Sequence, residues 1–467
     1  MSLEPIGIIA FAIGIFCLLR GNGPSVIAMS IASVLGAAAA MLIGSANIQP
    51  GHVLLGFLVI GVATRPAEAR AAVRALRPGS PGFWYAVLVI YSVMSAYFAP
   101  RLLAGITRII PLGSTIYGDT HSPVPLVPGS SNLTQSVYMI GNLICFVVVV
   151  AVGSTPKGFK AILNAIIAYC IANTVFAILD VVTFSTGTGF ILGFIRNAQY
   201  VLHVDDQVGG SKRIVGSFPE ASTFARSTLG VFGFVATLWL CGRRPYLNAF
   251  LAVSSFALLV LSTSSTGLAG APVLLIVLYL TALRLAGRPS LRKFTATVIV
   301  FVPLAGMAIL LWIATDPQLL KFFYDYADLV VLGKGSTSSG IERNNWNVVA
   351  MQNVFDTFGL GTGLGTVRTS SFAVALLANV GIPGTIAYLC FAYGALLKRR
   401  GTLGSLSSDI QLAARNGCIG LLLGDLLVAS AIDQGLFFCL LAAIATAEPG
   451  GEELPQPSPR PIQGAMA

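Results

Sequence analysis

Charged residues are scarce in this chain. Only 10% of its 467 residues are Asp, Glu, Lys or Arg, and 55% are apolar. A soluble protein carries about 25% charged residues, so a soluble fold of this composition could hardly cover its surface. The composition therefore excludes the soluble classes and predicts a polytopic membrane protein.

Residues that bind metals or form disulfides are also few. The three histidines, His52, His121 and His203, share no local motif, which argues against a zinc site built from histidine. The seven cysteines all lie in or beside apolar segments, without a CxxC motif. Because their number is odd, a complete set of intrachain disulfides is impossible. We expect no metal, no cofactor and, from the absence of a basic start and a cleavage site, no removable signal peptide.

Long apolar runs are abundant. They predict membrane spans at 6–19, 25–44, 52–64, 83–100, 137–153, 161–183, 228–241, 247–263, 267–283, 294–314, 372–396 and 417–447. The last run is too long for one helix, and the polar break Asp433-Gln434-Gly435 is expected to split it into a tight hairpin. The fold class is therefore all-α, a polytopic integral membrane protein with about 12 or 13 transmembrane helices.

Basic residues predict the orientation of these spans. Most of them fall in alternate short connections, which the positive-inside rule places in the cytoplasm. The N-terminus and three long loops, 101–136, 185–227 and 316–371, are then extracytoplasmic. We expect a single transmembrane domain over 1–447 and a disordered Pro/Gly-rich tail over 448–467. The net charge of +10 follows from topology, without a nucleic-acid partner.

Three carboxylates, Asp180, Asp425 and Asp433, fall within predicted spans. A charge at mid-bilayer costs about 2.5–3.5 kcal/mol on insertion scales, so such residues can mark a transport or proton pathway. All three can instead lie near helix ends, where that cost is smaller. A transporter of polysaccharide or lipid-linked sugar is thus one class of function that the sequence leaves open.

The outward loops carry more polar chemistry. Loop 185–227 places Lys212, Arg213 and Arg226 beside Asp205, Asp206 and Glu220. In loop 316–371, apolar residues recur at helical spacing and predict an amphipathic helix over 343–358 on or near the membrane face: Trp346, Val349, Ala350, Val354 and Phe358. Arg343 opens that helix and Arg368 closes the loop. Because a guanidinium fork matches phosphate oxygens, the loop arginines suggest an anion site.

Several segments resemble known binding or modification motifs only in part. The glycines at 359, 361, 363 and 365 do not form GxGxxG and follow no predicted strand, so they do not predict a dinucleotide site. We expect them to let the backbone turn tightly and approach a bulky ligand. VVLGKGSTS (330–338) departs from a P-loop because Gly335 separates the lysine from the serine. Asn132-Leu133-Thr134 fits a glycosylation sequon, as many chance tripeptides do.

Three segments in order resemble the O-antigen ligase and O-antigen/exopolysaccharide polymerase superfamily. They are RIVGSFPEASTFA (213–225), STSSTGLAG (262–270) and IERNNWNVVAMQNVFDTFGLGTGLGTVRTSSFAVALLANVGIPGTIAYL (341–389). The third is the most specific, since Arg and Trp begin a loop helix, a glycine turn follows, and Gly-Ile-Pro-Gly lies in the next helix. The resemblance covers roughly 210–445, whereas the N-terminal spans match only in being hydrophobic.

The resemblance implies a membrane glycosyltransferase of the GT-C type on the outer face of a bacterial inner membrane. Such enzymes pass a glycan from undecaprenyl diphosphate to a hydroxyl, without a metal and with inversion. The motifs carry over four catalytic candidates: Arg213, Glu220, Arg343 and Arg368. Glu220 is the first choice for general base and Glu342 the second. The candidates for substrate binding are Arg226, Glu342, Trp346, Ser370 and Ser371.

The chain also departs from the ligase pattern. Ligases usually have a histidine where this chain has Ser370-Ser371, and STSSTG lacks their Ser-Arg pair. We therefore favour a polymerase, with the lipid bilayer and a lipid-linked oligosaccharide as partners, and with a chain-length regulator or export proteins left open. A ligase that uses lipid A–core, a transporter and a scaffold subunit are the alternatives. Glu220, Ser370 and Ser371 also suit helix caps, so capping is the alternative to a functional role for these residues.

Overall fold

The computed structural model describes residues 2–43, 46–118, 122–208, 210–327, 337–398 and 404–450. His121, most of the segment 330–338 and the tail beyond residue 450 lie outside the described residues. The prediction of a disordered tail is thus not addressed by the structure.

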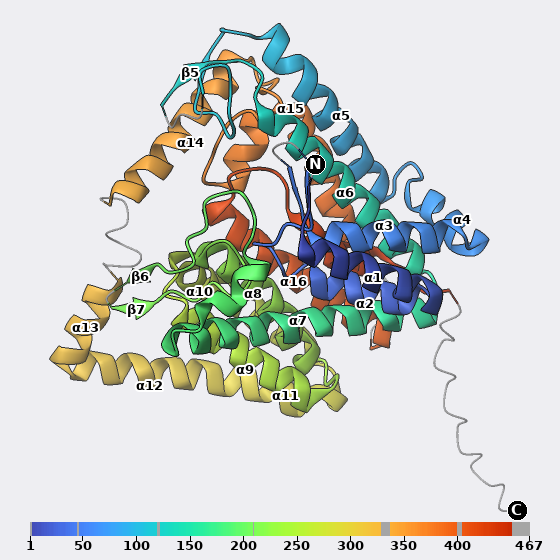
Figure 1. Cartoon of the computed structure of the whole chain (residues 1–467). Coiled ribbons are helices and arrows are strands. Elements are labelled where there is room, and N and C mark those ends of the chain that lie inside the picture. Colours follow the sequence, from blue (N-terminus) through green and yellow to red (C-terminus); the bar gives the residue numbers. More distant parts are fainter. Residues whose placement is uncertain are drawn as a thin grey trace, which may run out of the picture.

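The described chain is mainly helical, with only a few short strands, as the long apolar runs predicted (Figure 1). The first eight α-helices are α1 (Pro5–Arg20), α2 (Asn22–Ala32), α3 (Pro50–Ala63), α4 (Pro66–Ala75), α5 (Pro81–Leu102), α6 (Ser130–Gly153), α7 (Pro156–Ser185) and α8 (Ala221–Leu240). The remaining ones are α9 (Pro245–Leu261), α10 (Ser265–Leu285), α11 (Arg292–Ala296), α12 (Val302–Thr315), α13 (Pro317–Ala327), α14 (Ser338–Asp356), α15 (Phe372–Ala392), α16 (Leu406–Val428) and α17 (Gly435–Thr446). Short 3-10 and π-helical turns are η1 (Gly189–Ile195), η2 (Pro289–Leu291), η3 (Thr297–Phe301) and η6 (Tyr393–Leu397).

Eight helices of the described chain are long and apolar enough to cross a membrane, or nine if the bent pair of α3 and α4 counts as one span. Three shorter apolar helices, α1, α9 and α17, occupy further predicted spans. The protein is therefore an all-α polytopic membrane protein. Helix α12 has apolar side chains exposed along most of its length and lies at the lower edge of Figure 1.

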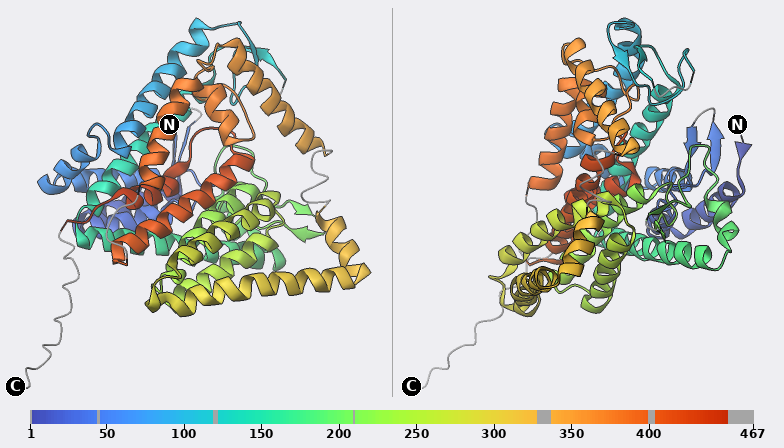
Figure 2. Two further views of the ribbon diagram at one scale, coloured as in Figure 1. Left: turned by 180° about the vertical axis from the view of Figure 1, so that it is seen from behind. Right: turned by 90° about the vertical axis from the view of Figure 1, so that its left-hand side faces the viewer.

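The few strands are short and antiparallel. β1 (Ser2–Leu3), β2 (Met41–Ile43) and β3 (Ala46–Ile48) form one sheet, in that order. Two hairpins complete the set: β4 (Arg108–Ile109) with β5 (Val124–Pro125), and β6 (Gln207–Val208) with β7 (Ser211–Lys212). The right-hand view of Figure 2 shows the three-stranded sheet and α15 on opposite sides of the molecule.

The predicted span 25–44 is wrong beyond Ala32, where α2 ends. The chain continues without a helix because its backbone groups pair with other segments. The amide of Ala37 donates to Ser217 O at 2.9 Å, and the amide of Ala40 donates to Ile48 O at 2.8 Å. Non-helical backbone within an apolar bundle is tolerated where protein covers it. The result is a wall of irregular backbone beside the loop that precedes α8.

The predicted span 417–447 is split, as expected, but its limits differ. The first half, α16, begins eleven residues earlier than expected, so Arg415 lies inside a helix and not in a loop. The break is an irregular, bent segment between Val428 and Gly435, after which α17 packs back against α16. This segment forms part of the site described below.

Helices α8 and α16 approach each other closely through glycines. A Cβ on Gly420 would lie 2.4 Å from Leu229 O, and one on Gly424 would lie 2.9 Å from the Cα of Arg226. Small residues at helix contacts are the usual means of such packing in membranes. Here the contact sets Arg226 of α8 beside Asp425 of α16.

The glycine run 359–365 packs against protein backbone. Its four glycines have φ between 74° and 101°, a region that favours glycine. A Cβ on Gly361 would lie 2.5 Å from Gly381 N, and one on Gly363 would lie 2.6 Å from Ser95 O. The tight turn is confirmed, but the expected approach to a bulky ligand is wrong because helices α5, α6 and α15 fill that space. Gly381, with φ 63°, kinks α15 at the same contact, so the run and the Gly-Ile-Pro-Gly motif fit each other.

Candidate active site

A polar cavity of about 370 Å³ lies where the loop before α8 meets the break between α16 and α17. Its wall includes Ser33, Gly36, Gln49, His52, Gln135, Tyr138, Tyr169, Tyr200, Phe218, Pro219, Glu220, Thr223, Arg226, Asp425, residues 428–431 and residues 433–437. Polar side chains converge there from α3, α6, α7, α8 and α16. We call this space the central cavity. A polar cavity inside an apolar bundle is the default position for a binding or catalytic site.

Glu220 lies on the wall of the central cavity at the N-cap position of α8. The position agrees with the capping alternative, but the side chain makes no capping hydrogen bond to the helix backbone. One carboxylate oxygen instead accepts from the hydroxyls of Ser222 and Thr223. The other lies 3.9 Å from Nη2 of Arg343. Helix capping therefore does not account for this carboxylate.

Arg343 reaches Glu220 from α14, the helix predicted over 343–358, which begins five residues earlier than expected. Ala350 and Val354 are buried on the inner face of α14. Phe358 lies beyond the helix end with 88% of its surface exposed. Phe358 is therefore not part of the predicted apolar stripe. Trp346 lies one turn from Arg343 on α14. Helix α14 packs beside α15 (Figure 1).

Arg368 lies next to the same helix. Its guanidinium carbon is 5.2 Å from the ring centre of Trp346, a cation–π contact. Its Nη2 donates weakly to Leu112 O at 3.4 Å, and its main-chain amide donates to Ile110 O. The following residue, Thr369, donates to Ala429 O in the cavity wall at 3.1 Å. The structure thus brings Arg343, Trp346 and Arg368 to one edge of the central cavity.

Arg213 has a different neighbour. Its Nη1 lies 4.0 Å from Asp206 in the β6–β7 hairpin. Within the described residues, no hydrogen bond or ion pair joins it to Glu220. The hairpin loop is nevertheless attached next to the cavity, because the amide of His203 donates to Pro219 O at 2.8 Å. Of the four catalytic candidates, Glu220 and Arg343 are in direct contact.

Arg226 forms a buried ion pair with Asp425 on the cavity wall. Its Nε and Nη2 donate to the two carboxylate oxygens, and Nη2 also donates to Gln434 O at 2.9 Å. A bidentate pair of this kind fixes both side chains. Asp433 accepts from Asn142 Nδ2 at 2.5 Å and from the amide of Gly435 at 2.9 Å. Both carboxylates lie at helix ends, as the sequence allowed.

Asp180 is occupied by a separate network near the end of α7. Its oxygens accept from Arg196 at 2.6 Å and from the amides of Val215 and Gly216 at 2.9 and 3.1 Å. Lys212 lies 3.1 Å away. These contacts fasten the segment that leads into Glu220. Asp180 does not line the central cavity, so its role in this geometry is to hold that segment.

His52 is the residue that sequence reasoning missed. It lines the central cavity from α3, and its ring lies 5.7 Å from that of Tyr138, centre to centre. Its only sequence signal is that it is a histidine inside an apolar segment. Tyr200, in the loop before α8, lies in the same wall and donates to Gly36 O. Burial raises the pKa of Tyr200 to about 12, so its hydroxyl stays protonated near neutral pH.

The remaining candidates lie outside the cavity wall. Glu342 is exposed and lines a shallow hollow on the outer part of α14. Ser371 is the N-cap residue of α15, but its side chain makes no capping hydrogen bond. The buried Ser370 donates its amide to Asn347 Oδ1 at 2.8 Å. Asn132 of the sequon is also buried and donates to Leu364 O and Thr366, so a glycan could not be attached there without disrupting that contact.

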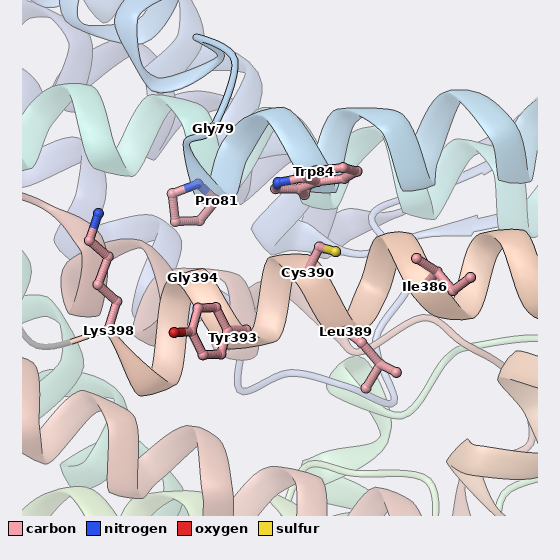
Figure 3. Close-up of a pocket in the computed structure, with 9 residues that line it drawn as sticks. All are labelled: Gly79, Pro81, Trp84, Ile386, Leu389, Cys390, Tyr393, Gly394 and Lys398. Atoms are coloured by element: carbon pink, nitrogen blue, oxygen red, sulfur yellow. The ribbon is translucent and has the colours of Figure 1, made fainter.

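A second hollow, of about 450 Å³, lies between the start of α5 and the end of α15 (Figure 3). Its wall is mostly apolar and includes Trp84, Leu389 and Tyr393. Lys398 is the one charged side chain among the described residues that line it. The described residues that line it include no carboxylate, so the central cavity is the better candidate for chemistry.

No model of a known protein family matches this chain, and no curated protein is significantly similar to it. The resemblance to polysaccharide polymerases and ligases therefore stays a prediction.

Proposed function

We propose that this protein is a polysaccharide polymerase, a membrane glycosyltransferase that joins undecaprenyl-diphosphate-linked repeat units on the outer face of a bacterial inner membrane. The observation that carries the proposal is the pair of Glu220 and Arg343, 3.9 Å apart beside a polar cavity within an apolar bundle. A carboxylate without a capping bond, next to a guanidinium from another segment, suits a general base beside an anion site.

In this proposal Glu220 takes the proton from the acceptor hydroxyl. The hydroxyl oxygen then bonds to the anomeric carbon of the donor, on the face opposite the diphosphate. The bond from that carbon to the phosphate oxygen breaks, and its electron pair leaves with the diphosphate.

Arginines are proposed to stabilise the leaving diphosphate. Arg343 and Arg368 share one edge of the cavity, with Trp346 between them. Charge-assisted hydrogen bonds of this type contribute about 1.5–3 kcal/mol each. Arg213, bound to Asp206 in the hairpin, would have to change partner to join them. We assign the clamp first to Arg343 and Arg368, and place Arg213 third.

The contacts of the intramembrane carboxylates favour an enzyme over a transporter. Asp180 is held by two cations and two amides, and Asp425 by Arg226. Groups that are so fully paired suit fixed structure better than alternate loading and release of a substrate ion.

The test is reconstitution of the purified protein in liposomes with an undecaprenyl-diphosphate-linked repeat unit. Longer glycan on the lipid supports a polymerase. Transfer only to added lipid A–core indicates the ligase instead, and movement of the lipid-linked unit across the bilayer without transfer indicates a transporter. If no glycan is transferred to either acceptor, the proposed function is wrong.

A further inference from the structure

The inner wall of the central cavity contains polar atoms without partners. Both ring nitrogens of His52 and Oε1 of Gln135 are buried and make no hydrogen bond in the described protein. Burying such atoms unpaired costs folding free energy, and native proteins nearly always pair them. Both side chains line the central cavity, so a ligand there can supply the missing partners.

The same wall is rich in aromatic rings with hydroxyls. Tyr169 stacks on Phe437 with ring centres 3.7 Å apart. The hydroxyl of Tyr138 donates to Asn47 O at 2.8 Å, and that of Tyr200 donates to Gly36 O. Each hydroxyl oxygen still has acceptor capacity. The edges of these rings, with their hydroxyl acceptors, suit a ligand with C–H groups and hydroxyl donors, as a sugar ring has.

The cavity and its edge carry charges of opposite sign. Three acidic residues line the cavity, Glu220, Asp425 and Asp433, and one basic residue, Arg226. The formal charge of the lining is therefore −2. Like charges repel strongly where water is excluded, so a diphosphate or an acidic sugar would be disfavoured inside. The arginine edge, with Arg343 and Arg368, has the opposite sign.

We infer that the central cavity is a subsite for a neutral sugar ring, with His52 and Gln135 binding its hydroxyls, while the diphosphate stays at the arginine edge. This inference rests on the proposed function for the identity of the whole substrate. It adds the division of that substrate between two places, and it predicts that the sugar bound in the cavity is uncharged.

The test uses binding, which requires no turnover. The probes are the oligosaccharide released from its lipid carrier by mild acid, methyl glycosides of neutral hexoses, glucuronate and inorganic pyrophosphate. Saturation-transfer NMR on the detergent-solubilised full chain reports which of them bind. We expect the released oligosaccharide or a neutral glycoside to bind and glucuronate not to bind. Glucuronate bound as tightly as the neutral glycosides, or no neutral sugar bound at all, would overturn the inference.

Variants then locate the binding. His52→Ala and Gln135→Ala should each weaken sugar binding about tenfold, because each removes a buried hydrogen-bonding group. Both should leave pyrophosphate binding unchanged, whereas Arg368→Ala should weaken pyrophosphate alone. Gln135→Leu serves if His52→Ala does not fold, since it keeps much of the side-chain volume without a hydrogen-bonding group and should also weaken sugar binding about tenfold.

The inference and the proposed function fail differently. If the wild-type protein transfers glycan but both variants keep sugar affinity within about twofold, a change of less than half a kcal/mol, the inference is wrong and the proposed function stands. If the wild-type protein binds neutral sugar through His52 and Gln135 but transfers no glycan, the proposed function is wrong and the subsite stands.

Discussion

The glycine run 359–365 and the central cavity differ in how visibly the sequence displays them. The run is the most conspicuous motif of the chain. Its glycines nevertheless pack directly against neighbouring helices, which leaves no room for a ligand beside them. The cavity has no local motif, because its wall comes from α3, α6, α7, α8 and the break after α16. A conspicuous spacing here reflects packing, while the chemistry lies among residues far apart in sequence.

The two regions are joined through α14 and Arg368. Arg368 follows the run by three residues and packs on Trp346, which lies one turn from Arg343. The run therefore serves the cavity by fixing the position of this edge. The following predictions test that division between scaffold and site.

The buried ion pair in the cavity wall gives the largest expected change in stability. Asp425→Ala should destabilise the protein by about 3–5 kcal/mol, because it leaves the Arg226 guanidinium buried without its partner. Thermal unfolding in detergent measures this, with the exposed Asp205→Ala as control. The double variant Arg226→Met/Asp425→Leu should recover much of the loss. A double variant as unstable as the single one would contradict this account of the pair.

Loss of the Glu220 carboxylate should affect turnover and not stability. Glu220→Gln keeps the shape of the side chain and should reduce polymer formation about 10²–10⁴-fold, the usual contribution of a general base. The matched control is Glu342→Gln, an exposed carboxylate on the outer part of α14. If Glu342→Gln abolishes polymer while Glu220→Gln does not, the base is Glu342.

A methyl group in the glycine run should disturb the scaffold. Gly361→Ala should destabilise the protein by about 2 kcal/mol or more, since it combines a left-handed φ with a contact of 2.5 Å to Gly381 N. Gly56→Ala, inside α3 and with no atom within 4 Å, is the control and should be neutral or slightly stabilising. Equal unfolding temperatures for the two variants would mean that the run is not packed as described.

The smallest expected effect concerns the serine before α15. Ser371→Ala should change stability by less than about 0.5 kcal/mol, because its side chain makes no capping bond, whereas a working N-cap contributes about 1 kcal/mol. Ser80→Ala, which removes a hydroxyl that accepts from Phe83 N at 3.1 Å, should cost that larger amount. The two unfolding curves compare them directly. A larger loss for Ser371→Ala would show that it caps after all.

Much of the fold could be predicted from the sequence because long apolar runs and helical spacing are local signals. The helix over 343–358 and the break near Asp433 are examples. The end of α2 could not be predicted, since it depends on Ser217 O and Ile48 O, which accept from distant amides.

The candidate site was predictable only in part. Glu220, Arg343 and Arg368 lie in segments with a family resemblance, whereas His52 and Gln135 lie in N-terminal helices that match only in hydrophobicity. A lone histidine or glutamine in an apolar helix gives no sign of what it faces. Its meaning depends on the contacts of α6 with α3 and with α17, which exist only in the folded chain.

The most direct test of the central claim is a double-mutant cycle on Glu220 and Arg343, with glycan transfer from the lipid-linked repeat unit as the measured rate. If the two side chains act together beside the cavity, the double variant Glu220→Gln/Arg343→Ala should be no slower than the slower single variant. Single variants that each keep the wild-type rate at normal protein levels, or losses that multiply in the double variant, would contradict the claim.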